Sequence, residues 1–403
     1  MVPGRKVTQP AGRPRLLILV YSRLEMDARV LRQIRWLSRR FDVTSAGFGP
    51  SPVEGVPHVE LAALPPYAGG TLARLVYVIS FVLGRFAGLT ARNPQDSAAV
   101  ELLDFQEWDV IVANDVSALP AATRLRSRHG ILADLHEYAP RQADESLLFR
   151  LTEARYFRWV LKRWLRRAGR VTTVSQGIAD EYSREFGVEP VVVANAAAYR
   201  EGEPRPVGSP IRIVHSAVPS PARHIEVMIE AVTATRTSVT FDLYLVDDGS
   251  AYLRGLRHLA DASDRVTIHG AVPNSELVDV LAGYDIGVHL LPSINFNHRW
   301  ALPNKFFDFV QARLGIVIGP SPEMARVVNE YGLGAVAQDF TAESLTRVFD
   351  DLDAEQVAQW KLASNRAARP LSGESQLEIF ERVVQEMLAS PPGPGDPSAQ
   401  AGR

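Results

Sequence analysis

The sequence contains no cysteine, which excludes disulfide bonds, thiolate catalysis and thiolate metal sites. It also lacks an excess of either charge: 44 basic and 46 acidic residues leave a formal net charge of −2. Nothing in the overall charge therefore favours nucleic acid as a partner. The first residues lack the apolar core of a signal peptide. We expect a cytoplasmic protein, either free or peripheral on the inner face of the cell membrane.

Long apolar runs and nucleotide-binding glycines are scarce as well. In residues 71–90 the uninterrupted apolar core is about ten residues, half of what a membrane-spanning helix needs. This segment therefore predicts a helix that is buried or lies at an interface. Gly47 and Gly49 follow the second predicted strand rather than the first, and no third glycine completes a dinucleotide fingerprint. Hydride transfer is disfavoured on this ground.

Strand and helix patterns alternate along the chain. Residues 15–21 and 131–135 are continuous apolar runs, which are typical of strands buried on both faces of a sheet. The alternation stops at residues 201–210, a linker-like segment rich in Pro and Gly, and then restarts. The predicted units are a disordered arm at 1–14, a first α/β domain at 15–203, a second at 204–370, a helix at 371–389 that could cross back to the first domain, and a disordered tail at 390–403.

Residues 300–319 combine the features of an anion site. Pro303 suits a helix start, because its missing N–H would have no partner there. The N–H groups of Asn304 and Lys305 would then lie at the positive helix end, where phosphate binds. Asp308 follows Lys305 by about one turn. The cation and the carboxylate could hold the diphosphate and ribose of a nucleotide; the alternative is an ordinary Lys–Asp pair on a surface helix.

Polar side chains follow two of the predicted strands. His136 and Glu137 come directly after residues 131–135, and ligands of open α/β sheets bind past the carboxyl ends of strands. His136 is therefore a candidate for chemistry, with a capping or structural histidine as the alternative. Asp247 and Asp248 also follow a strand, but they lack the spacer of a metal-binding Asp-x-Asp. We interpret them as a turn.

Residues 150–170 have the most unusual composition in the chain. They contain eight Arg or Lys, one Glu and two Trp. Phe157, Val160 and Trp164 share one helical face with Leu161 and Leu165. A basic helix with Trp on its apolar side is typical of an interfacial anchor on an anionic membrane. The alternative is a helix whose apolar face is buried in its own domain.

Five segments follow one another in a specific order. They are Asp27-Ala-Arg29-Val30; residues 171–175 with Asn195 beyond them; residues 223–231; residues 265–270 with Pro292-Ser293 beyond them; and Leu302-Pro-Asn-Lys-Phe-Phe-Asp308. Together they resemble the retaining GT-B glycosyltransferases (family 4-like, glycosyl transferases group 1), in an envelope-polysaccharide variant. The resemblance extends over about residues 15–388.

The resemblance implies two Rossmann-like α/β domains that face each other across a cleft. It implies a nucleoside-diphosphate sugar as donor and a glycan, lipid-linked or small-molecule acceptor, with retention of configuration and without metal or cofactor. The place of action would be cell-envelope polysaccharide or glycolipid synthesis. The implied catalytic residues are Arg223, Lys305 and His136. The implied donor contacts come from Pro303, Asn304, Lys305, Asp308, Arg223 and Asp248, and the acceptor contacts from Ser22, Arg23, Asp27 and Glu137.

The sequence departs from the family pattern at three places. Trp300 stands where the family has the first of two glutamates, Ser216-Ala217 stands near the usual Gly-Arg, and Arg223 replaces a lysine. Two other functions therefore stay open: a GT-B sugar-nucleotide epimerase, and an inactive scaffold that binds a nucleotide or a membrane.

Overall fold

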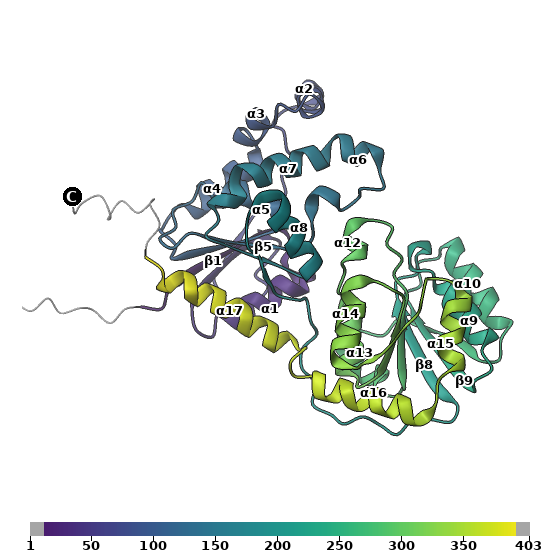
Figure 1. The fold of residues 1–403 in the computed structure, drawn as a ribbon. Helices are drawn as coiled ribbons and strands as arrows, with labels where there is room; N and C mark the ends of the chain where they lie inside the picture. Colours follow the sequence, from purple (N-terminus) through teal and green to yellow (C-terminus); the bar gives the residue numbers. More distant parts are fainter. Residues whose placement is uncertain (1–11, 392–403) are drawn as a thin grey trace, which may run out of the picture.

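The computed structural model describes residues 12–391 and contains two α/β domains (Figure 1). The arm and tail predicted at 1–14 and 390–403 lie almost wholly outside the described residues. Each domain is built on one all-parallel sheet, as the alternation of strands and helices predicted. Among the described residues, no helix is long and apolar enough to cross a membrane.

The first domain has a seven-stranded sheet in the order β3-β2-β1-β4-β5-β6-β7. Its strands are β1 Arg15–Arg23, β2 Asp42–Phe48, β3 His58–Glu60, β4 Val110–Asn114, β5 Ile131–Leu135, β6 Arg170–Thr173 and β7 Val191–Val192. Its helices are α1 Ala28–Leu37, α2 Thr71–Val82, α3 Phe86–Ala91, α4 Pro94–Leu103, α5 Asp115–Ala122, α6 Leu147–Leu151, α7 Glu153–Trp164 and α8 Gln176–Phe186. The central strands are buried on both faces because helices cover both.

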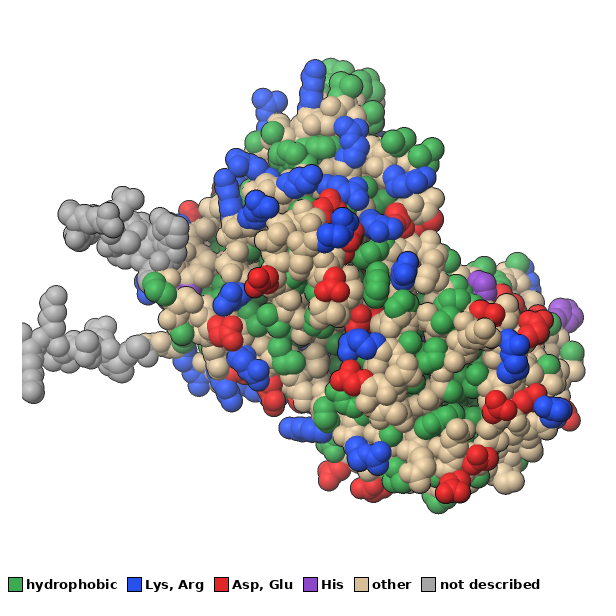
Figure 2. Space-filling view, in the orientation of Figure 1, with side chains coloured by type: hydrophobic (Ala, Val, Ile, Leu, Met, Phe, Trp, Pro, Cys, Tyr) green, Lys and Arg blue, Asp and Glu red, His purple; other side chains and the backbone are tan. Residues whose placement is uncertain are grey.

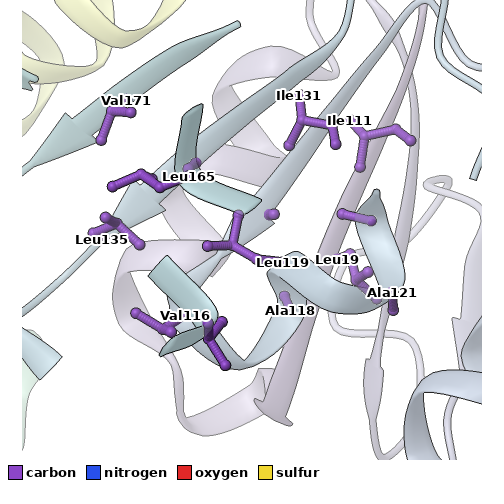
Figure 3. Packing of buried hydrophobic residues seen from close by; sticks show 14 of the residues in the cluster. Leu19, Ile111, Val116, Ala118, Leu119, Ala121, Ile131, Leu135, Leu165 and Val171 are labelled. Atoms are coloured by element: carbon purple, nitrogen blue, oxygen red, sulfur yellow. The ribbon is translucent and has the colours of Figure 1, made fainter. Parts of the chain in front are cut away.

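Figure 3 shows how this core is filled on one face of the sheet. Leu19 and Ile111 project from neighbouring strands toward Leu119 of α5, and Leu165 closes the cluster from the end of α7. All four side chains are fully buried. Burial of a side chain of this size stabilises the fold by about 1.5–3 kcal/mol. The sheet is therefore a rigid base for the polar residues at its carboxyl edge.

The second domain has a six-stranded sheet in the order β10-β9-β8-β11-β12-β13. Its strands are β8 Ile211–Ala217, β9 Val239–Leu245, β10 Val266–Gly270, β11 Ile286–His289, β12 Gly315–Ile318 and β13 Gly334–Val336. Its helices are α9 Ile225–Ala234, α10 Ala251–Asp261, α11 Asn274–Leu281, α12 Phe296–Arg299, α13 Asn304–Gln311, α14 Pro322–Tyr331, α15 Ala342–Asp350 and α16 Ala354–Ala367.

The last helix, α17 (Gly373–Ala389), returns to the first domain (yellow in Figure 1). Phe380 and Val384 are buried in the cluster that includes β1 and α1. The Trp36 indole N–H donates to Glu381 at 2.8 Å. The chain thus crosses between the domains twice.

Candidate functional site

A cavity of about 740 Å³ lies between the carboxyl edges of the two sheets. Residues of both domains line it: Ser22, Arg23, Asp27, Arg29, His136 and Glu137 on one side, and Asn297, Leu302, Pro303 and Asn304 on the other. The structure therefore brings the acceptor-side candidates opposite the start of α13. The two groups are separated in the chain by more than a hundred residues.

Helix α13 is positioned by its aromatic side. Phe306 and Phe309 are buried, and Phe309 packs directly on β11. A Cβ on Gly287 would lie 2.4 Å from the Phe309 ring, so only glycine permits this approach. Pro303 is the N-cap of α13 rather than its first residue. The helix therefore begins at Asn304, one residue later than predicted. The N-terminus of α13 still points into the cleft, as an anion site requires.

Lys305 lies in an environment that disfavours its charge. Burial, and then the neighbouring Arg223, lower the pKa of the Lys305 ammonium to about 7, although Asp308 acts in the opposite direction. Burial likewise raises the pKa of Asp308 to about 6, against the effects of Lys305 and Arg32. Burial lowers the pKa of Arg223 as well. The site concentrates positive charge that an incoming anion would stabilise.

Two histidines that the sequence analysis missed lie beside Lys305. His215 on β8 and His289 on β11 are buried, and their rings stack with centroids 5.6 Å apart. Burial, and then the charge of Lys305, hold the pKa of both well below the usual range, so both are neutral. The Nδ1–H of His215 donates to the Val288 carbonyl at 2.8 Å. Its Nε2 and both ring nitrogens of His289 have no partner among the described residues.

A buried ion pair supports the first-domain side of the cleft. The Arg29 guanidinium donates to both oxygens of Asp134, at 2.8 and 2.7 Å. Gln33 and Thr172 donate to the same carboxylate at 2.6 and 2.7 Å. Although burial opposes its charge, Asp134 keeps a pKa well below the usual range because of Arg29. The sequence analysis named Arg29 only within a family segment and did not predict its pairing with Asp134.

The ion pair in turn holds His136. Its Nε2 lies 3.1 Å from Asp134, and its Nδ1 lies 3.4 Å from Asp115. Burial disfavours the imidazolium, but Asp115 and then Asp134 raise the pKa of His136 above its usual value. Asp115 has φ of 63°, a conformation that is rare outside glycine and that aims its carboxylate back at His136. The two carboxylates therefore favour the protonated form of His136.

The other acceptor-side candidates have structural partners of their own. Asp27 caps α1 by accepting from the Val30 N–H at 3.1 Å, and it also accepts from the Ser22 hydroxyl at 3.0 Å. Arg23 is exposed at the rim. Burial, and then Asp115, raise the pKa of Glu137. These residues form a polar wall that a hydroxyl-rich molecule could contact.

The second domain reaches across the cleft through α12 and Trp300. The Asn297 amide accepts from the Tyr138 N–H at 2.9 Å and donates to Glu137 at 3.3 Å. Trp300 lies flat against Gly177, where a Cβ would come within 2.0 Å of the indole. The residue that departs from the family pattern is therefore a contact between the domains.

Asp247 and Asp248 form the exposed turn that their sequence predicted. Asp247 accepts from the Gly249 N–H at 3.1 Å, and Asp248 accepts from the Ser250 N–H at 2.9 Å. The Ser250 N–H bond keeps Asp248 within this turn, and its role as a donor contact stays a prediction. Across residues 12–391, no cluster of three or more His, Asp or Glu side chains has the arrangement of a metal site.

Comparison with known proteins relates the first domain to a sequence family and both domains to a known fold. Residues 26–197, which lie in the first domain, match the family model of Glycosyltransferase Family 4. No curated protein matches the sequence. The fold of both domains matches that of solved GT-B glycosyltransferases, so the chain has the GT-B fold, as its resemblance predicted.

Three solved structures illustrate the likeness. Anabaena Alr3699/HepE in complex with UDP and glucose is 15% identical, with a TM-score of 0.63 over 93% of this chain and 100% of that one. A glycosyltransferase from Rickettsia africae is 11% identical, with a TM-score of 0.64 over 94% and 100%. Sucrose-phosphate synthase from Thermosynechococcus elongatus is 12% identical, with a TM-score of 0.62 over 94% and 100%.

Proposed function

We propose that this glycosyltransferase moves a sugar from a nucleoside-diphosphate sugar to a hydroxyl of a glycan, lipid-linked or small-molecule acceptor, with retention. The observation that carries the proposal is the group formed by Lys305, Asp308 and Arg223 at the N-terminus of α13. It combines concentrated positive charge for a diphosphate with a carboxylate one turn away for ribose hydroxyls. The solved structure of HepE is a complex with UDP and glucose, and that of a trehalose-6-phosphate protein from E. coli is bound with UDP-2-fluoro glucose, which supports this donor class.

In the proposed reaction, the bond between the anomeric carbon and the diphosphate oxygen breaks. A new bond forms from that carbon to the acceptor oxygen, and the acceptor proton leaves with the diphosphate. Lys305 and Arg223 would stabilise the charge that develops on the leaving oxygen, which is commonly the largest single contribution to catalysis. Asp308 would accept hydrogen bonds from ribose hydroxyls, so that it fixes the donor without taking part in bond breaking.

The first domain would bind the acceptor. Because Asp115 and Asp134 raise the pKa of His136, we assign it a donor role toward the substrate rather than that of a base. Glu137 and Ser22 would contact other hydroxyls of the acceptor. We further propose a cytoplasmic enzyme of envelope polysaccharide or glycolipid synthesis, with the cations of residues 150–170 turned toward an anionic membrane.

A thermal-shift screen of nucleoside diphosphates and their sugars tests the proposal. A donor at a hundred times its Kd should stabilise the protein by about 2.7 kcal/mol. Product analysis with and without acceptor then separates the remaining alternatives. An epimerase releases free nucleotide with no acceptor present, a scaffold consumes no donor, and a transferase forms a product whose mass includes the acceptor. Absence of any nucleotide-dependent shift would refute a donor site.

Activity should survive EDTA. Arg223 and Lys305 supply the positive charge that a divalent ion would otherwise place on the diphosphate. The measurement is the initial rate with excess EDTA, compared with the rate after dialysis and addition of Mg²⁺ or Mn²⁺. A rate that collapses in EDTA and returns with either ion would contradict this role for the two cations and would direct attention back to Asp247 and Asp248.

A further inference from the structure

Helix α2 exposes its apolar side chains to an unusual degree. None of its twelve residues is buried, and Leu72, Leu75, Val76 and Ile79 are each about half or more exposed, at 75, 53, 56 and 49%. The only charged residue within it is Arg74. A buried helix, one of the two alternatives predicted for this segment, is therefore excluded. A twelve-residue helix is marginal in water and usually needs packing on an apolar face.

Only one edge of α2 is attached to the domain. The ring of Phe81 lies 5.5 Å from that of Tyr156 on α7 and 5.6 Å from that of Phe86. Tyr77 stacks on Phe81, with ring centroids 5.9 Å apart. In Figure 1 the helix stands out at the far end of the first domain, away from the second. The attachment holds α2 in place while its apolar faces stay open.

A second apolar element lies next to α2. Helix α6 exposes Leu147, Leu148 and Leu151, at 62, 72 and 56%. Between α2 and the α6–α7 segment runs a groove of about 550 Å³. Its lining includes Tyr77, Val78, Phe81, Val82, Leu148 and Phe149. The exposed apolar side chains of α2 and α6 form one apolar surface with the groove between them. We name it the α2–α6 surface; its exposed members are Leu72, Leu75, Val76, Ile79, Leu147, Leu148 and Leu151.

Basic side chains surround the α2–α6 surface. Residues 71–92 and 147–170 contain one acidic side chain, Glu153, which lines the groove, and Asp144 and Glu145 lie just before α6. The exposed cations on α2, α3 and α6, in the loops that join them and at the start of α7 are Arg74, Arg85, Arg92, Arg150 and Arg155. Figure 2 shows green and blue atoms gathered over this end of the molecule. Two copies of the chain meeting here would bring these cations against one another, which disfavours a dimer.

Helix α7 contributes charge rather than apolar area. Val160, Leu161 and Leu165 are buried in the domain core, and Trp159 and Trp164 pack against it. The apolar face that the periodicity of residues 150–170 identified is thus turned inward. Any apolar insertion has to come from α2 and α6, whose leucines and valines have no such core.

We propose that the α2–α6 surface enters the hydrocarbon boundary of an anionic lipid bilayer, with the groove between α2 and α6 open to a lipid chain. Apolar side chains that enter the bilayer leave water, and the surrounding arginines attract anionic headgroups. Both attractions act on the same face. They require nothing from the donor site, so the lipid contact is independent of catalysis.

The position of the surface also bears on the acceptor, and this step rests on the proposed function. Glu137 lines the cleft, and Ala143 lines the groove six residues later. Six residues span at most about 20 Å. A lipid-linked acceptor could therefore keep its hydrocarbon chain at the α2–α6 surface while its polar head reaches His136. This geometry favours a lipid-linked acceptor over a soluble glycan.

Vesicle co-sedimentation tests the lipid contact. We expect the wild type to pellet with vesicles of phosphatidylglycerol and phosphatidylcholine, and weakly with phosphatidylcholine alone. The double variant Leu75→Glu/Ile79→Glu should bind the anionic vesicles at least about 30-fold more weakly, because two apolar side chains are lost from the lipid contact. Its fold should be unchanged, since neither side chain is buried. Leu362→Glu, which alters an exposed leucine of the second domain at 41% exposure, is the matched control.

Two further measurements separate the outcomes. Ultracentrifugation without lipid should show a monomer; a dimer abolished by the double variant would assign the surface to self-association and overturn the proposal. Equal vesicle binding by wild type and double variant, or none by either at low salt, would also overturn it. The thermal shift with donor should be the same in both proteins. Its loss from both would refute the proposed function and leave the lipid result standing.

Discussion

Replacing Lys305 with alanine is expected to lower kcat for sugar transfer by about two to three orders of magnitude, the scale for loss of one preorganised electrostatic contact in an active site. Lys305 combines a helix N-terminus, partial burial and a neighbouring Arg223. A charge held in such surroundings needs little rearrangement when the diphosphate begins to leave. The loss should therefore appear mainly in kcat rather than in the KM of the donor.

The pH dependence provides a readout that a purely structural lysine would not change. Because Lys305 has to be protonated, kcat/KM for the donor should fall as the pH rises through about 7. Because Asp308 has to be ionised, it should also fall as the pH drops through about 6. The two groups interact, so the two limbs belong to the pair. Lys305→Arg should remove the alkaline limb, since a guanidinium stays charged.

The matched control for this experiment is Lys162→Ala. Lys162 is an exposed lysine on α7, and with a soluble acceptor its removal should leave kcat unchanged. Circular dichroism and thermal unfolding establish that each variant is folded. A folded Lys305→Ala protein with wild-type turnover would remove Lys305 from the mechanism. A bell-shaped profile retained in Lys305→Arg would assign the alkaline limb to another group.

The candidate site residues that could be predicted from the sequence are those whose signal is local. Lys305 and Asp308 lie one turn apart at a helix start, and His136 directly follows a strand; these patterns are visible within a few residues. The paired histidines were missed because His215 and His289 meet only through the pairing of β8 with β11, 74 residues apart in the chain. No local pattern reports which strands become neighbours.

Fold class followed from the sequence for a similar reason. Buried parallel strands read as continuous apolar runs, so both sheets could be predicted from segments such as residues 15–21 and 131–135. Periodicity also identified the apolar face of α7, but it does not show what covers that face. In the structure the core of the first domain covers it, because Val160 and Leu161 are buried there. The contact of Trp300 with Gly177 depends on the arrangement of the two domains and has no sequence pattern.

The ion pair of Arg29 and Asp134 supplies the largest expected effect on stability. Arg29→Ala would leave the Asp134 carboxylate buried without its main partner, which costs about 3–5 kcal/mol of unfolding free energy. Urea denaturation at pH 8 measures this loss as a lower midpoint. Arg35→Ala, an exposed arginine on the same helix, is the control and should change stability by no more than about 0.5 kcal/mol.

The cost of Arg29→Ala should shrink as the pH is lowered. In the variant, Asp134 has His136 as its remaining cationic neighbour, at 3.1 Å, so the folded protein gains stability by keeping a proton on this pair. A group whose pKa is raised in the folded state adds stability below its unfolded pKa and loses it as the pH rises. The wild type should show a weaker trend of the same sign, because the pKa of His136 is raised there too but Arg29 opposes that rise. If Arg29→Ala lowered the unfolding free energy by the same amount at pH 5.5 and at pH 8, Arg29 would stabilise the domain by packing rather than by its charge.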